Sequence, residues 1–543
     1  MMKIRNLLYV SILLFVTLFI GIYFGSHMSR RSLMPGKKST QQATDKLSSI
    51  IRLIDAAYVD TIDSKNIVEK SIPAILENLD PHSTYIPARD MQEVEEEMQG
   101  NFSGIGVQFA IQEDTIMIVD VISGGPSSKL GILPGDRIVM VNDSLVAGKG
   151  IKNDQVLKLL RGKKGTRVKI SNSRKGFKNL LDFDITRGEI PIYSVDVSYM
   201  IDNETGFIKV SRFGEQTYKE FTEAMEKLDT SGASKIVIDL RGNPGGYLAA
   251  VINMVNDFLE KGDPILVTKG KSQPQKTYSA NNKNRWSNKK LYLLIDEFSA
   301  SASEIFAGAI QDNDRGIVIG RRSFGKGLVQ EQIPFSDGSA LRLTVARYYT
   351  PSGRCIQKSY KDGNEKYFED LFARMKHGEF RSADSIQFAD SLKYMTKNGR
   401  KVYGGGGIMP DFFVPADTTG RSDYFEKIYQ KGLVYQYALY YSDINRKALQ
   451  KLSGPSGISD YLEKQNILKS FIDYSASKGV AADNEGLRVS GFIIKTQLKA
   501  YIARNILGEE GFYPILQEID KTLLKAIEIS KQNLLVENLV KKE

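Results

Sequence analysis

The spacing of apolar residues changes character several times along the 543-residue chain. An uncharged apolar run fills residues 7–25, apolar residues recur at helical spacing between residues 45 and 99, and short strand-like runs separated by glycine turns occupy residues 101–187. Strand and helix patterns then alternate across residues 206–351, and helical patterns return after about residue 421. The pattern therefore predicts a multidomain α+β chain with helical, small β and α/β parts.

The alternating region has the pattern of an α/β core. Its apolar runs are expected to be buried strands at residues 206–211, 235–240, 264–268, 291–295 and 316–319. Helices are expected at residues 217–228, 248–259 and 302–311, and two further strands, at residues 328–335 and 339–349, are expected to close the domain. Strands that alternate with helices favour a layered α/β sheet.

The apolar run at residues 7–25 has the length of a membrane span. It follows Lys3 and Arg5, and its 19 residues are near the roughly 20 that cross a bilayer and more than the roughly 7 to 15 of a signal-peptide core. No A-x-A-like cleavage site follows it. We expect an uncleaved signal anchor over residues 1–28, in preference to a removed signal peptide, and a polar linker over residues 29–44.

Composition narrows the class of protein. A content of 41% hydrophobic and 25% charged residues is that of a globular chain. The single cysteine, Cys355, excludes an intrachain disulfide framework and a multi-cysteine metal site. The net charge of +10 is spread along the chain without a long basic block, so it does not indicate nucleic-acid binding.

Residues 291–330 carry the candidate chemistry. The segment SASAS at 299–303 lies between a predicted strand and a predicted helix, and a serine in such a turn can be a nucleophile. Ser301 and Glu304 also fit a capping box, in which the serine does no more than begin a helix. Further on, Lys326 lies between two glycines that give its backbone freedom.

The base for a serine nucleophile is expected to be a lysine. The three histidines, at positions 27, 82 and 377, lie in stretches without catalytic features, so a Ser-His-Asp triad is poorly supported. Lys326 can serve if burial lowers its pKa from about 10.4 toward about 7 to 8. Gln330, four positions on in a predicted strand, shares a face with Lys326 and can orient its amine.

Two further observations concern Lys326. Glu304 and Asp312, the nearest acids on the serine side, would raise its pKa on contact, so we expect neither to contact it. The stretch GRRSFGK at 320–326 also fits the opening of a phosphate-binding loop. Gly327 stands where such a loop needs Ser or Thr, and a strand pattern follows instead of a helix, so nucleotide binding is disfavoured.

The stretches SASASE and SFGKGLVQ, with Lys326 placed 25 positions after Ser301, resemble the carboxyl-terminal processing proteases, or tail-specific proteases, of peptidase family S41. The resemblance implies a crotonase-like α/β protease core that needs no metal and no cofactor. It implies Ser301 as nucleophile, Lys326 as general base and Gln330 as the residue that orients the lysine. Chemistry alone does not separate Ser301 from Ser299 and Ser303; the family's spacing does.

Two other features gain a meaning from this resemblance. The stretch RGNPGG at 241–246 is by itself a tight turn before a helix, but beside a nucleophile its unhindered amides can stabilise an oxyanion. By resemblance to the family's motif, the amide of Gly245 or Gly246 pairs with that of Ala302. The resemblance also implies a supporting, structural role for Asp312.

Residues 101–187 resemble a PDZ domain in the order of their stretches GIGVQF, IMIVDV, GDRIVMVN and VLKLLRG. Consecutive amides in a glycine loop can bind a C-terminal carboxylate, while the adjoining edge strand adds the peptide by β-augmentation. The loop residues are Gly104, Ile105, Gly106 and Val107. We expect Ile105 and Val107 to border the groove; the alternative is a small β-domain whose groove is unused.

Together these features predict a serine endopeptidase that binds accessible, apolar C-termini of protein substrates and cleaves near them; the alternative is a non-catalytic PDZ scaffold. The family implies that the bulk lies outside the cytoplasm, at the periplasmic face of the inner membrane. A homo-oligomer or an adaptor protein is left open as a further partner. The expected parts are a signal anchor (1–28), a linker (29–44), an N-terminal helical segment (45–100), a PDZ domain (101–187), a protease core (188–415) with an insertion at about 359–400, and a helical C-terminal extension (416–543).

Overall fold

The computed structural model describes residues 38–122, 124–281 and 283–532, which fall into two compact units, Met1–Asn78 and Leu79–Glu543. The apolar run at residues 7–25 lies outside the described residues, so the signal anchor stays a prediction. Within the described ranges, no helix is both long enough and apolar enough to cross a membrane.

The first unit contains the helices α2 (Lys38–Ala57) and α3 (Ser64–Leu76). The carboxylate of Asp63 accepts the amide of Asn66 at 3.2 Å and so caps the start of α3. The helical pattern predicted from residue 45 is confirmed, and α2 begins seven residues before it.

The second unit opens with β1 (Thr84–Ile86) and α4 (Met91–Gln99) and continues into the small β-domain. The main sheet of this domain has the order β3-β4-β5-β7-β8, with β6 paired to β5, while β2 pairs with β9. The elements are β2 (Asn101–Gly104), β3 (Val107–Gln112), β4 (Thr115–Val121), α5 (Pro126–Lys129), β5 (Arg137–Val141), β6 (Ser144–Leu145), α6 (Asn153–Leu160), β7 (Arg167–Ser173), β8 (Leu181–Thr186) and β9 (Gly188–Pro191). Strand β3 lies at one end of the sheet order, and α6 packs on the same apolar core.

A six-stranded sheet of order β10-β11-β12-β15-β16-β21 forms the centre of the second unit. Its strands are β10 (Val195–Met200), β11 (Thr205–Val210), β12 (Lys235–Asp239), β15 (Lys290–Ile295), β16 (Ile317–Gly320) and β21 (Phe412–Phe413). All neighbours from β11 to β21 are parallel, and β10 is antiparallel to β11. The α/β core predicted from the alternating pattern is therefore confirmed.

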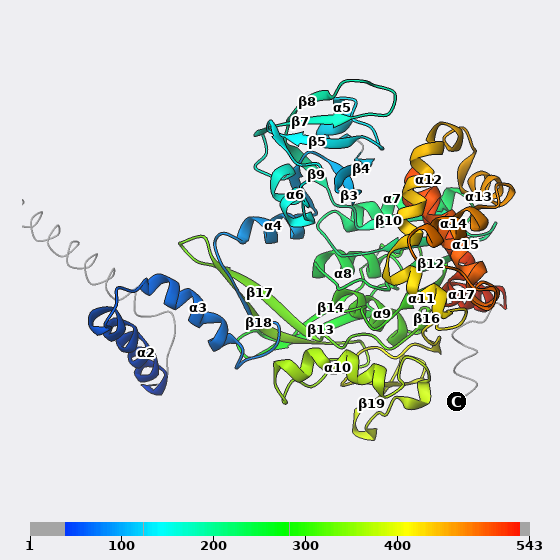
Figure 1. Cartoon of the computed structure of the whole chain (residues 1–543). Coiled ribbons are helices and arrows are strands. Elements are labelled where there is room, and N and C mark those ends of the chain that lie inside the picture. The colour runs from blue at the N-terminus through cyan, green and yellow to red at the C-terminus, as the bar shows by residue number, and fades with distance from the viewer. Residues whose placement is uncertain (1–37, 123, 282, 533–543) are drawn as a thin grey trace, which may run out of the picture. The chain divides into compact units, whose positions relative to one another are not determined.

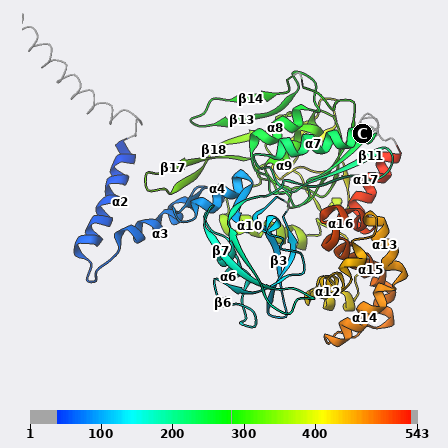
Figure 2. The ribbon, with the colours of Figure 1, turned by 90° about the horizontal axis from the view of Figure 1, so that it is seen from above.

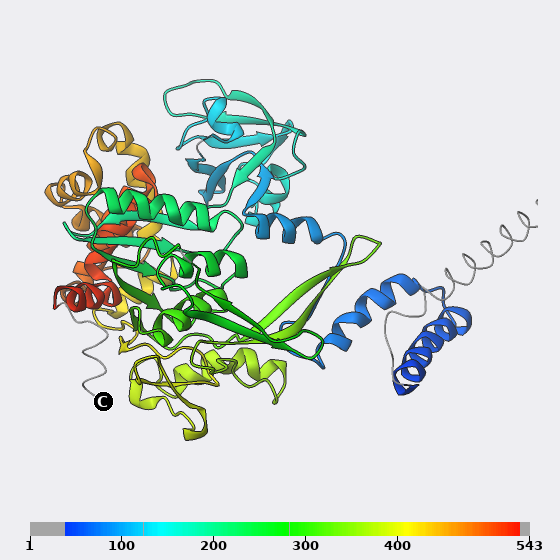
Figure 3. The ribbon, with the colours of Figure 1, turned by 180° about the vertical axis from the view of Figure 1, so that it is seen from behind.

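Alternate residues of each strand point to opposite faces of this sheet, and both faces are covered and buried. One face packs against α7 (Thr217–Thr230), α8 (Leu248–Asn256) and α9 (Ala302–Asp312). The other face packs against α17 (Lys521–Lys531) near the C-terminal end of the chain (Figures 1 and 3). The helix that completes the core thus comes from the part of the sequence that was expected to be a separate extension.

A second sheet contains β17, the strand that follows Lys326 in the sequence. It consists of β1, β13 (Pro264–Gly270), β14 (Lys276–Ser279), β17 (Leu328–Pro334) and β18 (Ala340–Tyr349), and β18 pairs with β1, β13 and β17. The predicted strand at 264–268 is present, but it belongs to this antiparallel sheet and not to the parallel one. Strands β17 and β18 form a long two-stranded ribbon (Figure 3).

The remaining elements are helices and short strands. Residues 359–400 contain α10 (Asn364–Lys376), η1 (Ala383–Ser385), η2 (Asp390–Leu392) and β19 (Lys393–Met395), which pairs with β20 (Lys401–Tyr403). The C-terminal helices share a core of their own and gather in one bundle (Figure 2). They are α11 (Asp423–Gln430), α12 (Leu433–Leu449), α13 (Gly454–Lys464), α14 (Ile467–Ser477), α15 (Asn484–Leu507) and α16 (Glu509–Leu516), followed by η3 (Gln517–Ile519).

Candidate active site

Ser301 lies at the turn between β15 and α9, immediately before the first residue of the helix. Its φ of +55° and ψ of −112° are uncommon for a residue with a side chain, and such strain is typical of functional turns. The amide of Ser301 donates to Oε2 of Glu304 at 2.9 Å, which is the hydrogen bond by which Glu304 takes part in the predicted capping box.

The three serines of the SASAS segment have different surroundings. The hydroxyl of Ser299 donates to the carbonyl of Leu240 at 2.9 Å, and that of Ser303 donates to the carbonyl of Asn243 at 3.0 Å. Both side chains are fully buried, whereas Ser301 is half-buried. Ser299 and Ser303 therefore hold the turn together, and Ser301 is the member of the three that retains access to the surface.

Glu304 links the turn that contains Ser301 to residues 323–326, the segment that contains Lys326. Its Oε2 accepts the amides of Ser301 and Lys326 at 2.9 and 2.8 Å, and its Oε1 accepts the amide of Gly325 at 2.7 Å and the hydroxyl of Ser323 at 2.5 Å. Burial raises the pKa of Glu304 to about 7, while these hydrogen bonds act in the opposite direction. The expectation that Glu304 does not contact Lys326 is therefore wrong: the contact is made through the lysine backbone, which sequence reasoning about side chains did not consider.

The surroundings of Lys326 favour a neutral amine. Burial is the main cause that lowers its pKa below the ordinary lysine value, and the charge of Arg342 adds to this. Glu304 and Asp80 raise the pKa of Lys326 by smaller amounts. The hydroxyl oxygen of Tyr348 lies 2.6 Å from the carbonyl oxygen of Lys326 and 3.1 Å from that of Ser301, so its one proton is shared between the two carbonyls and links the two segments.

Gln330 follows on β17, where its amide nitrogen donates to the carbonyl of His82 at 3.0 Å. His82 belongs to the LDPHSTY turn, which is pinned by Asp80: the carboxylate of Asp80 accepts the amides of His82 and Ser83 at 2.9 and 3.0 Å and the hydroxyl of Thr344 at 3.0 Å. The hydrogen bonds of the described residues do not join Gln330 to the amine of Lys326. Its role in orienting the lysine remains a prediction.

Sequence reasoning missed the approach of His82 to Lys326. Burial, with the positive charge of Lys326 as the second cause, lowers the pKa of His82 to about 4, so its ring is neutral at neutral pH. Its Nε2 lies 2.9 Å from the hydroxyl of Tyr367 on α10, which links the insertion at 359–400 to the turn that contains His82. The polar DPHS turn in an otherwise helical stretch was the available signal.

The RGNPGG turn lies directly against the serine. A β-carbon on Gly245 would be 2.7 Å from the β-carbon of Ser301 and 2.9 Å from the amide nitrogen of Ala302. The amide of Gly245 donates to the side-chain oxygen of Asn243 at 2.9 Å, so it is engaged in the turn itself. Gly246 is exposed, which favours its amide over that of Gly245 as an oxyanion donor.

Asp312, at the end of α9, has partners of its own. Its carboxylate accepts from the hydroxyl of Ser352 at 2.7 Å and from the guanidinium of Arg354 at 2.7 Å, and both charged side chains are fully buried. These contacts are those of a structural residue. Within the described parts of the chain, no group of three or more His, Cys, Asp or Glu side chains is placed to hold a metal ion.

The predicted carboxylate loop connects β2 to β3. Gly106 has a φ of +78°, and the amide and hydroxyl of Ser127 donate to the carbonyl of Ile105 at 3.0 and 2.7 Å. Ile105 is only 2% exposed and belongs to the core of the β-domain, whereas Val107 is half-buried. Of the two side chains expected to border the groove, Val107 therefore retains surface.

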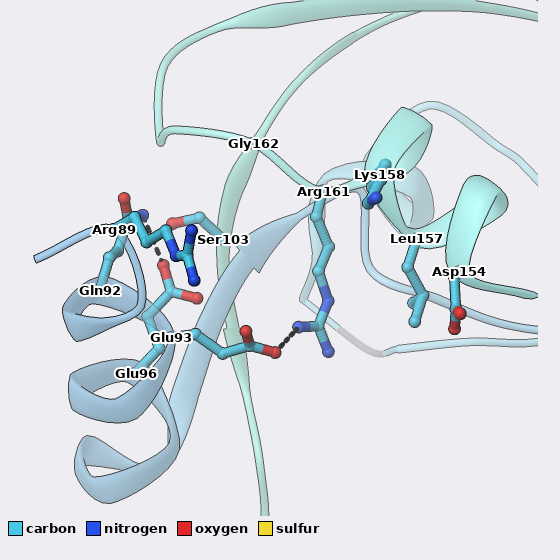
Figure 4. Close-up of a pocket in the computed structure, with 10 residues that line it drawn as sticks. All are labelled: Arg89, Gln92, Glu93, Glu96, Ser103, Asp154, Leu157, Lys158, Arg161 and Gly162. Atoms are coloured by element: carbon cyan, nitrogen blue, oxygen red, sulfur yellow. Dashed lines mark hydrogen bonds and ion pairs between the residues drawn. The ribbon is translucent and has the colours of Figure 1, made fainter. Parts of the chain in front are cut away.

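A cavity of about 420 Å³ lies beside this loop, between α4 and the end of α6 (Figure 4). Its lining carries both signs of charge: Arg161 forms an ion pair of 3.7 Å with Glu93, and its guanidinium lies 4.7 Å from the ring centre of Phe102. The lining residues are Arg89, Gln92, Glu93, Glu96, Ser103, Asp154, Leu157, Lys158, Arg161 and Gly162. The cavity is separate from the residues around Ser301.

Comparison with known proteins relates these features to one family. The family description "Peptidase family S41" matches residues 204–364, "PDZ domain" matches residues 103–185, and a family of unknown function (DUF8443) matches residues 424–508. Among solved structures, a photosystem II D1 C-terminal processing protease is similar, with 27% identity, a TM-score of 0.33, and coverage of 56% of this chain and 87% of that chain.

Two curated relatives come from Bacillus subtilis. The carboxy-terminal processing protease CtpA is 38% identical over 315 residues, which are 58% of this chain and 66% of the relative. The carboxy-terminal processing protease CtpB is 34% identical over 363 residues, which are 66% of this chain and 73% of the relative. Because the match to CtpB extends over most of that relative, this chain belongs to the carboxy-terminal processing serine proteases of peptidase family S41.

Proposed function

We propose that this protein cleaves protein substrates near their free C-termini with a Ser-Lys dyad. The observation that carries the proposal is the shared anchoring of Ser301 and Lys326 on Glu304 and Tyr348. Both amides donate to Oε2 of Glu304, and both carbonyls share the one hydroxyl proton of Tyr348. A nucleophile and its base need such fixed geometry, because a misplacement of about 1 Å can slow a reaction about a hundredfold.

In the proposed reaction, the neutral amine of Lys326 takes the proton of the Ser301 hydroxyl as the oxygen attacks the scissile carbonyl carbon. The amides of Gly246 and Ala302 donate to the negative oxygen that forms. Lys326 then gives the proton to the departing amine, which leaves an acyl-enzyme on Ser301. Water, deprotonated by the same lysine, releases the acyl group and restores the serine.

The lysine needs an uncharged partner to orient it. We assign this role to Gln330, whose amide nitrogen is held by the carbonyl of His82 and whose amide oxygen is the natural acceptor for an N–H of Lys326. A neutral amide orients the amine without raising its pKa, as a carboxylate would.

We assign substrate selection to the loop from Gly104 to Val107. A free C-terminal carboxylate would bind the loop amides, and the residues before it would add to the edge of β3. Apolar side chains that are only partly buried, Val107 and Phe109 of β3 and Leu159 of α6, pack against the core of this domain. They favour a substrate with an apolar tail.

We also propose that residues 1–28 anchor the protease in the inner membrane with its bulk on the periplasmic side. The support is the apolar run of 19 residues at 7–25, which has the length of a bilayer span. A homo-oligomer or an adaptor protein stays open as a further partner.

The test is intact-mass detection of cleavage in a folded carrier protein that ends in an apolar tail. The same carrier with an amidated tail is the substrate control, because it lacks the carboxylate that the loop would bind. We expect cleavage by the full chain in detergent, none by Ser301→Ala or Lys326→Ala, and retained cleavage by the control variant Ser287→Ala, whose serine is exposed. Tail binding without cleavage by the unmodified chain would favour the PDZ scaffold instead, and cleavage by Ser301→Ala would mean that the nucleophile is another residue.

A further inference from the structure

Arg241, the first residue of the RGNPGG turn, lies in a cluster of four charged side chains. Its guanidinium donates to both carboxylate oxygens of Asp239, at 3.0 and 2.7 Å, and to both carboxylate oxygens of Asp520, at 2.8 and 2.6 Å. The ammonium of Lys209 lies 3.3 Å from Oδ1 of Asp239 and donates to the carbonyl of Arg241. Two positive and two negative groups therefore balance one another, and Asp520 supplies half of the negative charge.

Asp520 comes from the far end of the chain, 279 positions after Arg241. It caps α17 by accepting the amide of Leu523 at 3.1 Å. Leu523, Ala526 and Ile529 hold the helix on the face of the central sheet that is opposite to α9. The carboxylate of Asp520 is thus fixed by its own helix and, through that helix, by the sheet.

The turn that Arg241 begins has little rigidity of its own. Gly242, Gly245 and Gly246 all have positive φ, at 71°, 103° and 143°, and glycine leaves the backbone wide conformational freedom. Backbone hydrogen bonds hold part of it, since the carbonyls of Asn243 and Gly245 accept the amides of Ala300 and Phe213, both at 3.0 Å. Side chains hold the rest. The carboxylate of Asp296 accepts the backbone amide of Gly242 at 2.9 Å. The side-chain Nδ2 of Asn243 donates to the carbonyl of Val210 at 3.0 Å. The paired guanidinium of Arg241 holds the start of the same turn.

We infer that Asp520 is a positioning residue for the protease reaction: through Arg241, it holds the turn that presents the Gly246 amide beside Ser301. The inference rests on the proposed function, because it concerns the oxyanion site of that reaction. The last described helix of the chain is then a part of the catalytic apparatus, although it lies outside the segment that matches peptidase family S41.

The substitution Asp520→Asn isolates this role. Asparagine caps a helix about as well as aspartate, so the start of α17 is preserved, but the negative charge and one acceptor for Arg241 are lost. Asp483→Asn is the matched control, since Asp483 caps α15 in the same manner through the amide of Gly486. Leu523→Ala is the second control, because it weakens the packing of α17 and leaves the carboxylate in place.

The experiment measures kcat and KM on the tailed carrier protein, together with hydrogen exchange of the amides in residues 241–247. For Asp520→Asn we expect kcat to fall about tenfold or more and KM to change by less than about twofold, since the donor is displaced and the tail site is untouched. Exchange in residues 241–247 should become faster. Asp520→Glu should recover part of kcat, and Asp483→Asn should behave as the unmodified chain.

Several outcomes would overturn the inference. An unchanged kcat with unchanged exchange would do so, and so would an equal loss of kcat in Leu523→Ala at a matched melting temperature, because the effect would then be one of general stability. The double variant Arg241→Ala with Asp520→Asn must be no slower than Arg241→Ala alone. If the unmodified chain cleaves nothing, the proposed function fails, and the exchange rates then decide by themselves whether Asp520 holds the turn.

Discussion

The backbone of Gly245 approaches Ser301 so closely that a β-carbon on residue 245 would lie 2.7 Å from the β-carbon of the serine. The carbonyl oxygen of Ala300 would be almost as near, at 2.8 Å. Because backbone and a β-carbon cannot swing away, a side chain at this position must displace either the serine or the turn that carries it.

Gly245→Ala should therefore abolish most of the activity, with a loss in kcat of about a hundredfold or more. Gly242→Ala is the matched control in the same turn: its φ of +71° is also strained for alanine, but a β-carbon there meets nothing within 4 Å. Steady-state kinetics of the two variants separate the contact from the backbone strain. Equal losses in both would contradict the steric explanation.

The pH dependence of activity should follow the deprotonation of Lys326. Since burial lowers the pKa of Lys326 below that of a free lysine, kcat/KM should rise with pH and level off below the ordinary value of 10.5. His82 should add nothing to this limb, because its pKa is lowered to about 4. Rates from about pH 5 to about pH 11 would test this. A profile that is flat, or that rises only near pH 10.5, would exclude a buried lysine as the base.

The burial of Lys326 also destabilises the folded protein. In the folded protein its pKa is lowered, so between that value and 10.5 the unfolded chain binds more protons and stability rises with pH. At neutral pH the lysine therefore opposes folding. Lys326→Met, which keeps the length and removes the charge, should raise the melting temperature while abolishing activity. The exposed Lys447→Met is the control and should change neither; a lower melting temperature in Lys326→Met would contradict the reasoning.

Glu304→Gln tests the shared anchor. Three amides and one hydroxyl donate to the Glu304 carboxyl, so the NH2 of glutamine must face two of these groups and leave at least one amide without an acceptor. We expect a loss of about 2 to 4 kcal/mol in the free energy of unfolding and a lower kcat. Denaturant unfolding measures the first. Glu297→Gln is the control, a buried carboxylate that pairs with Arg321 and can keep one acceptor for it.

The pH dependence of stability distinguishes this variant further. The folded-state pKa of Glu304 is raised to about 7, so its contribution to stability is fully present below the unfolded value of 4.5 and is lost as the pH rises through about 7. Glu304→Gln should therefore remove that part of the decline in stability. An unaltered slope in the variant would show that Glu304 does not titrate in this range.

Gly106→Ala tests the carboxylate loop. Alanine is strained at the φ of +78°, and its β-carbon would lie 2.9 Å from the Cδ1 of Ile190. We expect weaker tail binding, by about tenfold, with a higher KM and little change in kcat at saturation. Gly124→Ala is the control, since its φ is also positive and a β-carbon there meets nothing within 4 Å. Binding of a tail peptide by calorimetry would decide, and equal affinities in both variants would remove the loop from substrate recognition.

Local pattern was sufficient for much of the fold. The strands β11, β12, β15 and β16 lie where their apolar runs predicted them, because a strand buried on both faces needs such a run whatever it pairs with. The same reasoning found the helix that begins after Ser301. It could not find the partner of β13, because an apolar strand has no local mark that chooses between a parallel and an antiparallel neighbour.

For the site, the sequence by itself determined which residue types stand at which spacing, and so the family; Ser301, Lys326 and the glycine turn follow from it as the predicted site. The tertiary structure alone decided which serine keeps access to the surface, and that Glu304 binds both segments through their backbones. It alone brought Asp520 to Arg241. The reason is physical: hydrogen bonds and charge pairs between distant segments depend on how sheets and helices stack, and a carboxylate in the sequence carries no mark of the donors it will face.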